Sequence, residues 1–244
     1  RVDRRTIIVG LALVAIFSSA LTMRMYPAQY GFYLNEFDPF FDYYATDFIV
    51  DQYDQNGLFG VGKYFTWTDN RTWYPEGRQV ANTSQVGLQL AGAGMYIVAR
   101  DVFGAQISLY DFVVLFPVYF GALTALVSFL LIRRIGGTSA GLLGSLVIAF
   151  SPPLIIRGNL GWFKSEPFAL FLSISALFLL LKALDSKTDR KRQIILGILV
   201  GVLLGYANAS WGGSQFFNII IALSFFALPF LRVDLSRIIP SAGS

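Results

Sequence analysis

Apolar segments alternate with polar ones along most of this chain, and the pattern predicts helices that cross a membrane. About 20 predominantly apolar residues span the hydrocarbon core as a helix, so each long apolar run is expected to be one span. The predicted spans are residues 6–23, 112–132, 138–150, 167–181, 194–207 and 216–231. We therefore predict an all-α polytopic membrane protein with about six transmembrane helices.

A long polar and aromatic segment, residues 24–110, separates the first two predicted spans. Turn signals such as Asn56-Gly57 and Pro75 favour a long outer loop there. Within it, Val86 to Ala99 is apolar but only about 14 residues long, which is too short to span comfortably. We expect an interfacial or re-entrant helix at this position.

The composition excludes several classes of protein and of chemistry. The chain is 55% hydrophobic and 14% charged, whereas soluble domains carry roughly 25% charged residues. Its net charge of +4 does not indicate nucleic-acid binding, because the basic residues are not gathered on one soluble face. Without any Cys or His, disulfides, thiolate chemistry and imidazole ligands are excluded. Catalysis or metal binding must therefore use carboxylates, hydroxyls or amines.

The basic residues predict the orientation of the chain in the membrane. Cytoplasmic segments are enriched in Lys and Arg, and the segment 182–193 contains five of them. With the N-terminus inside, the much longer outer segments hold only Arg24, Lys63, Arg71, Arg78, Arg100, Arg157 and Lys164. We expect both termini in the cytoplasm and the segment 24–110 on the other face of a cell membrane or an endoplasmic-reticulum membrane. A full span at 86–99 would place the segment 182–193 outside, so we reject it.

Two acidic stretches are expected on the outer face. The first, residues 33–49, carries four acids among aromatic side chains: Glu36, Asp38, Asp42 and Asp47. Pro39 biases Asp38 away from helix, so we expect Asp38 on a fixed, non-helical corner. In the second stretch, Glu166 directly precedes Pro167, a residue typical of the first turn of a helix.

Two interpretations of these acids remain open from the residues alone. Asp38 could lie in a solvated loop at the membrane interface, and Glu166 could be a charge that stabilises a helix N-terminus. Alternatively, Asp38 and Glu166 converge on one divalent cation. Mg²⁺ or Mn²⁺ would suit a site built from carboxylate and water oxygens.

Five stretches occur in the order in which a known enzyme family has them. NEFDPFFDYYAT at 35–46 is similar to the family's first acidic motif, HEFDPYFNYRTT, and TWYPEGR at 72–78 is similar to its WYPLGR. The others are ISLYDFVVLFP at 107–117, SPPLIIRGNLGWFKSEPFALF at 151–171 and ASWGGSQFFN at 209–218. On these motifs the chain resembles the N-terminal half of the membrane domain of oligosaccharyltransferase catalytic subunits.

The resemblance implies a membrane domain of the GT-C glycosyltransferase type and a role in protein N-glycosylation. The family transfers an oligosaccharide from a lipid carrier, dolichyl phosphate or pyrophosphate, to Asn of Asn-X-Ser/Thr in an acceptor polypeptide. Asp38 and Glu166 match the family's acidic motifs, so the resemblance implies that they are catalytic and hold Mg²⁺ or Mn²⁺. It also implies that Arg157 faces the anionic carrier.

Lys164 departs from the family pattern, which has an acid at this position of the second motif. An ammonium group cannot ligate a cation and would repel one. The chain could be a diverged or inactive member, or Asp42 could replace the acid while Lys164 binds the donor phosphate. Alternatively, a salt bridge from Lys164 supplies the positive charge that Asp38 and Glu166 need. Whether a divalent cation or Lys164 supplies the positive charge, we expect the carboxyl groups of Asp38 and Glu166 about 4–6 Å apart.

The family continues into further spans and a C-terminal soluble domain with a WWDYG motif, which does not occur in these 244 residues. We therefore expect the chain to act with the remainder of a longer or split enzyme, or with other subunits. Two other classes stay open: another membrane glycosyltransferase, such as the protein O-mannosyltransferases, and a non-catalytic scaffold or transporter. The WYP and WGG stretches disfavour the first, and spans with few polar residues disfavour a transporter.

Overall fold

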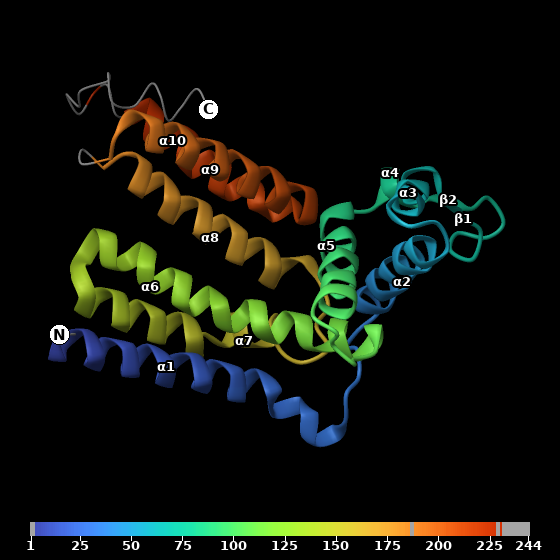
Figure 1. Ribbon diagram of the computed structural model, residues 1–244, viewed down its shortest axis with the longest axis horizontal. Coiled ribbons are helices and arrows are strands. Elements are labelled where there is room, and N and C mark those ends of the chain that lie inside the picture. The colour runs from blue at the N-terminus through green and yellow to red at the C-terminus, as the bar shows by residue number, and fades with distance from the viewer. Residues whose placement is uncertain (1–2, 186–187, 228–229, 231–244) are drawn as a thin grey trace.

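The computed structural model describes residues 3–185, 188–227 and 230, and its regular structure is almost entirely helical (Figure 1). The α-helices are α1 (Arg4–Met25), α2 (Asp38–Asn56), α3 (Leu58–Val61), α4 (Val80–Thr83), α5 (Val86–Ile97), α6 (Leu109–Phe150), α7 (Pro152–Ile156), α8 (Ser165–Ala183), α9 (Arg190–Ser210) and α10 (Gln215–Ala227). Short 3₁₀ or π turns cover Tyr26–Tyr30, Gly62–Thr66, Val98–Val102 and Gly212–Ser214. One antiparallel ribbon pairs β1 (Thr68–Asp69) with β2 (Arg78–Gln79).

The long helices form a bundle in which α1, α6, α8 and α9 each pack against the next (Figure 1). Four helices among the described residues are long and apolar enough to cross a membrane, at residues 4–30, 109–150, 165–183 and 190–210. These ranges contain five of the six predicted spans. The sixth, 216–231, corresponds to α10 but ends in residues outside the described part of the chain.

The long helix α6 contains two of the predicted spans, because the chain reverses at Gly137. The φ angle of Gly137 is 80° and its ψ is −178°, a conformation that essentially only glycine adopts. The two halves then lie against each other, and the Ser145 hydroxyl in the second half donates to the carbonyl of Ala125 in the first at 2.7 Å. The predicted boundary between residues 132 and 138 is therefore a sharp helical turn.

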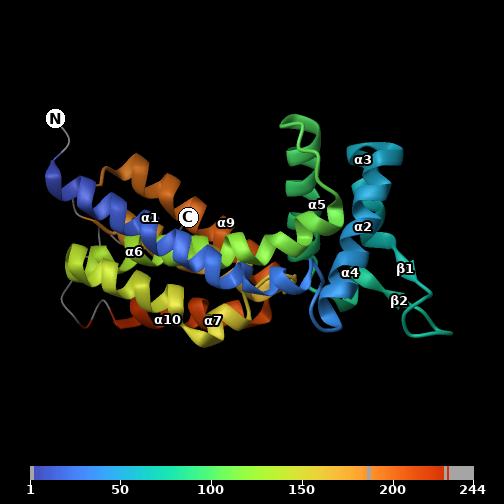
Figure 2. The same ribbon diagram turned by 90° about the horizontal axis from the view of Figure 1, so that it is seen from below.

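The segment predicted as an outer loop is mostly helical. α2 and α5 pack together across one end of the bundle, roughly at right angles to it (Figure 2). α2 buries Ala45, Thr46 and Ile49, which supplies the packing that a solvated loop would lack. The predicted short helix at 86–99 is present as α5, and its interfacial position stays a prediction.

Arg24 differs from its predicted place in the outer segment, because it lies buried in the last turn of α1. Its Nη1 group donates to the carbonyls of Ala20 and Ala149, each at 3.1 Å. The side chain packs so closely on Gly121 that a methyl group there would come within 2.6 Å of the guanidinium. Arg24 therefore fastens α1 to both halves of α6, and one cation fewer faces the outer side.

Candidate active site: an acidic groove at the end of the bundle

A groove of about 460 Å³ lies where α2, the β1–β2 region and the start of α8 meet. Its lining includes residues from four of the five family-like stretches: Phe37, Asp38, Phe41, Asp42, Thr72, Trp73, Arg78, Lys164, Ser165, Glu166 and Trp211. These stretches are far apart in sequence and each is weak evidence alone. Their convergence on one groove makes it the candidate active site.

The two acidic stretches are fixed to each other by hydrogen bonds from Asn35 to backbone carbonyls. The backbone N–H of Asn35 donates to the carbonyl of Gly161 at 3.0 Å, and the side-chain Nδ2 of Asn35 donates to the carbonyl of Leu160 at 2.6 Å. Gly161 has a φ of +82°, and a Cβ there would lie 1.9 Å from the carbonyl oxygen of Tyr33. Only glycine permits this approach, so the contact sets how Asp38 faces the start of α8.

Asp38 begins α2, and the predicted non-helical corner is wrong. A proline disfavours helix at the residue before it, but proline itself is favourable in the first turn of a helix. Pro39 lies in the first turn of α2, so Asp38 is helical here. A carboxylate at this end of a helix is stabilised by the helix dipole. The side chain of Asp38 is 68% exposed and lines the groove.

Lys164 forms an ion pair with Asp38. Its Nζ lies 2.7 Å from Oδ2 of Asp38 and 3.8 Å from Oε2 of Glu36, while its side chain is only 19% exposed. Burial alone would lower the pKa of Lys164, but the hydrogen bond and charge of Asp38, with the charges of Glu166 and Glu36, raise it above the ordinary value. The ammonium group is therefore firmly charged at neutral pH.

Glu166 lies buried in the first turn of α8 and pairs with Arg157. The Arg157 Nη1 group donates to Oε1 of Glu166, whereas Oε2 is buried without a hydrogen-bond partner among the described residues. The Arg157 side chain is 54% exposed, so its guanidinium keeps further N–H groups accessible. Both predicted acids thus line the groove, each paired with a cation. Their predicted separation stays a prediction.

Asp42 takes part in a network that the sequence analysis missed. Gln89 of α5 donates to Oδ1 of Asp42 at 2.7 Å, and the buried Tyr64 hydroxyl donates to the Gln89 side-chain oxygen. Burial raises the pKa of Asp42 to about 7, a rise that the Gln89 hydrogen bond opposes and the charge of Asp38 adds to. The available signal was Gln89 itself, a lone polar side chain in the apolar run of α5.

The loop that carries Trp73 into the groove is organised by buried Asp69. Its carboxylate accepts hydrogen bonds from the Tyr44 hydroxyl at 3.0 Å, the Arg71 N–H at 3.1 Å and the Thr72 N–H at 3.0 Å. Burial by itself would raise the pKa of Asp69, but these bonds and one from the Thr72 hydroxyl lower it. Asp69 therefore holds the WYP-containing loop against α2.

The donor set does not fit a divalent cation as the groove stands. Such an ion needs several oxygen ligands within about 2.0–2.6 Å, yet Asp38 is bound by Lys164 and Glu166 by Arg157. No group of three or more acids able to hold a metal occurs among the described residues. Asp42 does not complete one, because Gln89 holds its carboxylate.

A smaller hollow of about 340 Å³ adjoins the groove and shares Glu166 and Trp211 with it. Its remaining lining is mostly apolar, with two cations at its walls: Arg24, Gly121, Thr124, Pro153, Leu154, Arg157, Pro167 and Leu170. Arg157 lines this hollow and pairs with Glu166, which lines both the hollow and the groove. An amphiphile with an anionic head and an apolar tail would match this pair of surfaces.

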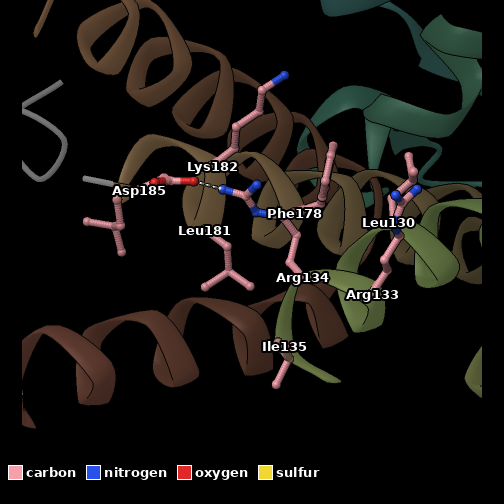
Figure 3. A pocket seen from close by; sticks show the side chains of 9 residues that line it. Leu130, Arg133, Arg134, Ile135, Phe178, Leu181, Lys182 and Asp185 are labelled. Carbon is pink, nitrogen blue, oxygen red and sulfur yellow. Dashed lines mark hydrogen bonds and ion pairs between the residues drawn. The ribbon is translucent and has the colours of Figure 1, made fainter. Parts of the chain in front are cut away.

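A third hollow lies beside the reversal of α6 and the end of α8 (Figure 3). It measures about 700 Å³ and includes Arg133, Arg134 and Lys182, with Arg134 paired to Asp185 at 2.7 Å. None of its lining residues belongs to the five family-like stretches. Its size alone therefore does not make it the candidate active site.

Comparison with known proteins gives the family. Residues 5–234 match the family model described as oligosaccharyl transferase STT3, N-terminal. The chain is 30% identical over 225 residues to the Saccharomyces cerevisiae dolichyl-diphosphooligosaccharide–protein glycosyltransferase subunit STT3, which covers 92% of this chain and 30% of that protein. The Schizosaccharomyces pombe subunit is 27% identical over 219 residues, covering 89% of this chain and 27% of its own length. The chain thus spans less than a third of these relatives.

Solved structures show the same fold. The Archaeoglobus fulgidus oligosaccharyltransferase AglB, solved with an inhibitory peptide and a dolichol-phosphate, has a TM-score of 0.75 at 22% identity, over 96% of this chain and 28% of its own. A structure of that organism's enzyme with Zn and sulfate has a TM-score of 0.69 at 23% identity, over 88% of this chain and 27% of its own. The predicted all-α, polytopic membrane architecture is confirmed. The chain belongs to the oligosaccharyl transferase STT3 family and comprises its N-terminal region.

Proposed function

We propose that this chain contributes the acidic half of an active site that transfers a lipid-linked oligosaccharide to Asn of Asn-X-Ser/Thr. Its relatives are named for this kind of transfer, and the chain corresponds to about 30% of their length. The observation that carries the proposal is the groove, where four separate motif stretches gather around exposed Asp38. The remaining part of the enzyme, or other subunits, would complete the site for the acceptor polypeptide.

The chemistry requires a carboxylate close to the acceptor amide. Resonance delocalises the lone pair of an amide nitrogen and makes it a poor nucleophile. In the proposed step Asp38 accepts a hydrogen bond from the amide, and the nitrogen forms a bond to C1 of the sugar. The C1–O bond to the carrier breaks, the phosphate leaves with the electron pair, and the amide proton passes to Asp38.

The leaving phosphate would be stabilised by the cations of the groove. Lys164 pairs with Asp38, and Arg157 pairs with Glu166, so both cations place positive charge beside the acids. Preorganised positive groups stabilise charge that develops in a transition state. The adjoining apolar hollow suits the first part of a lipid carrier such as a dolichyl chain.

A divalent cation does not enter this proposed step. The family resemblance implies Mg²⁺ or Mn²⁺, and a structural neighbour was solved with Zn. Asp38 and Glu166 would be its ligands, and such an ion would supply further positive charge for the leaving phosphate. With both acids already paired, the residues present do not fit it, and the chain's own groups provide the charge.

The proposal includes an orientation in the membrane. With both termini in the cytoplasm, the groove opens on the extracytoplasmic side of a cell or endoplasmic-reticulum membrane. Arg133 and Arg134 lie beside the reversal of α6. Figure 1 shows this reversal at the opposite end of the bundle from α2, which contributes residues to the groove. This distribution supports the orientation by the positive-inside rule.

Transfer can be tested with the full-length enzyme, a lipid-linked oligosaccharide and a fluorescent peptide containing Asn-X-Thr. Asp38→Asn should lower the rate by about 100-fold or more, as expected when a group acting on the transition state is lost. Asp54→Asn is the matched control, because Asp54 lies on the same helix and pairs with Arg100 outside the groove. Equal rates for the two variants would reject the proposed site.

The same assay separates the proposed reaction from O-mannosyl transfer. A peptide in which Gln replaces the acceptor Asn should receive no sugar, whereas a protein O-mannosyltransferase would still modify its Thr. Modification of the Gln peptide at Thr would reject the proposed N-glycosylation in favour of O-mannosyl transfer.

A further inference from the structure

We propose that the Lys164 ammonium group occupies the cation position between the acids of the groove, so that Asp38 and Glu166 hold no divalent cation. This deepens the proposed function, because it names the positive charge that the site uses. The structural half of the proposal concerns cation binding alone. It can be measured without any transfer reaction.

The position of Lys164 is the first argument. Its Nζ lies within ion-pair distance of two carboxylates, at 2.7 Å from Asp38 and 3.8 Å from Glu36. It also lies 5.2 Å from the centre of the Trp162 ring, within the range of a cation–π contact. An ammonium group held by two carboxylates and an aromatic ring has little freedom to leave the groove.

The backbone around Lys164 is equally well anchored. Lys164 is the extended residue that precedes α8, and its N–H donates to the carbonyl of Trp162 at 2.7 Å. The preceding residue, Phe163, is fully buried and packs edge to face on Phe116 of α6. The ammonium group is therefore delivered to Asp38 by a fixed stretch of chain, not by a free surface side chain.

A divalent cation in the same place would meet strong repulsion. To bind Asp38 it would have to lie about 2.0–2.6 Å from a carboxylate oxygen, next to an ammonium group 2.7 Å from Oδ2 of the same carboxylate. Glu166 offers only Oε2, because Arg157 binds Oε1. Lys164 and Arg157 thus each bind one carboxylate oxygen of an expected metal ligand. Their positive charge disfavours a divalent cation at the same place.

The substitution changes what the groove can do. A lysine supplies one positive charge and three N–H donors, and unlike a bound ion it cannot be removed by a chelator. Asp38 keeps its negative charge beside the ammonium and remains able to accept a hydrogen bond from an acceptor amide. We therefore expect transfer that continues in EDTA and gains little from added Mn²⁺.

The test measures Mn²⁺ binding to the purified full-length enzyme. Bound Mn²⁺ is detected as a decrease in the electron paramagnetic resonance signal of free Mn²⁺. The parent should have no Mn²⁺ site that the Asp38→Asn substitution removes. Lys164→Asp should gain about one bound Mn²⁺ per chain, and the double change Lys164→Asp with Asp38→Asn should lose it. Lys63→Asp is the matched control, because it reverses the same charge at an exposed position outside the groove.

Each outcome decides the proposal. Mn²⁺ that binds the parent and is lost in Asp38→Asn would overturn it, and so would a folded Lys164→Asp protein that binds no Mn²⁺. If Lys164→Asp does not fold, the comparison of the parent with Asp38→Asn still decides.

The transfer assay separates failure of this inference from failure of the proposed function. Transfer that EDTA abolishes and Mn²⁺ restores would overturn the lysine proposal and leave the proposed function intact. No transfer to Asn, together with the expected Mn²⁺ results, would reject only the proposed function.

Discussion

The two ends of the helical bundle both gather charged side chains, but they balance them differently. At the groove, Lys164 and Arg157 neutralise Asp38 and Glu166 in a space shared with buried residues. At the other end, Arg133, Arg134 and Lys182 surround a hollow in which Asp185 is the acid among the described lining residues (Figure 3). One end matches positive to negative charge and the other leaves an excess of positive charge.

This difference separates the proposed active site at the groove from the basic end of the bundle, whose charge indicates membrane orientation. Excess Lys and Arg at a membrane surface are expected on the cytoplasmic side, where they need only water and lipid headgroups. Acids next to apolar helices are costly unless something positive or polar meets them. The balance of positive and negative charge, and not the size of the hollow, therefore distinguishes the groove, which is the proposed reactive end. The following experiments test this contrast between the ends.

The largest difference is expected in accessibility from outside the cell. The chain has no Cys, so a single introduced Cys reports on one position. Lys63→Cys, near the groove end, should react fully with a membrane-impermeant maleimide in intact cells, and Ser139→Cys, next to the reversal of α6, should not react. Both side chains are exposed, so burial does not explain the difference. Labelling of Ser139→Cys from outside would invert the proposed orientation.

Glycines at the two ends should differ strongly in their effect on stability. Gly161→Ala adds a clash with the Tyr33 carbonyl to the strain of a positive φ, and should cost about 4 kcal/mol. Gly137→Ala meets no atom within 4 Å and should cost only the strain, about 1–2 kcal/mol. Thermal unfolding in detergent measures both. Similar midpoints for the two variants would show that the Tyr33–Gly161 contact is not tight.

The two arginine pairs should also differ, by a smaller amount. Arg157→Met leaves Glu166 buried without its partner and should lower the unfolding free energy by about 2 kcal/mol. Arg134→Met breaks the partly exposed pair with Asp185 and should cost about 0.5 kcal/mol. The same unfolding measurement applies, and adding Glu166→Gln to Arg157→Met should recover part of the loss. A larger loss for Arg134→Met would reverse the contrast.

A further contrast between the two ends is expected in the pH dependence of stability, to which Asp42 contributes. Its folded-state pKa is about 7, well above the ordinary value of 3.8. The folded protein therefore holds this proton more tightly than the unfolded chain, and stability from Asp42 is lost as the pH rises from about 4 to 7. Asp42→Asn should flatten this slope, measured as unfolding midpoints from pH 5 to 8. Asp185→Asn, at the other end, serves as the control, and an unchanged slope in Asp42→Asn would contradict the raised pKa.

Much of the architecture was predictable because apolar run length and family-like motifs are local signals. The spans and the two acidic stretches could be located from them, and one of the interpretations left open for Lys164 was the salt bridge that is observed. α2 was missed because its acids and aromatics resemble an interfacial loop until α5 is known to cover it. A single sequence does not show that cover.

Two features of the site depend on contacts that no local pattern contains. Arg24 was expected on the outer side because it directly follows the predicted first span, yet its partners are carbonyls of α1 and α6. The Tyr64–Gln89–Asp42 network joins three separate elements, so only the fold reveals it. In both cases the cost of burying a polar group is offset by hydrogen bonds, most of which join residues distant in sequence.

The Asn35–Leu160 hydrogen bond also has a consequence for how the protein is made. Its two residues are 125 positions apart. At synthesis rates of about 5–20 residues per second, the first acidic stretch waits roughly 6–25 s before its partner emerges from the ribosome. During that time Glu36 and Asp38 have no Lys164 beside them, and closure of this long loop must await the segment that contains Leu160 and Lys164. Assembly of the groove is thus a late event in biogenesis, because the helices between the two stretches are synthesised first.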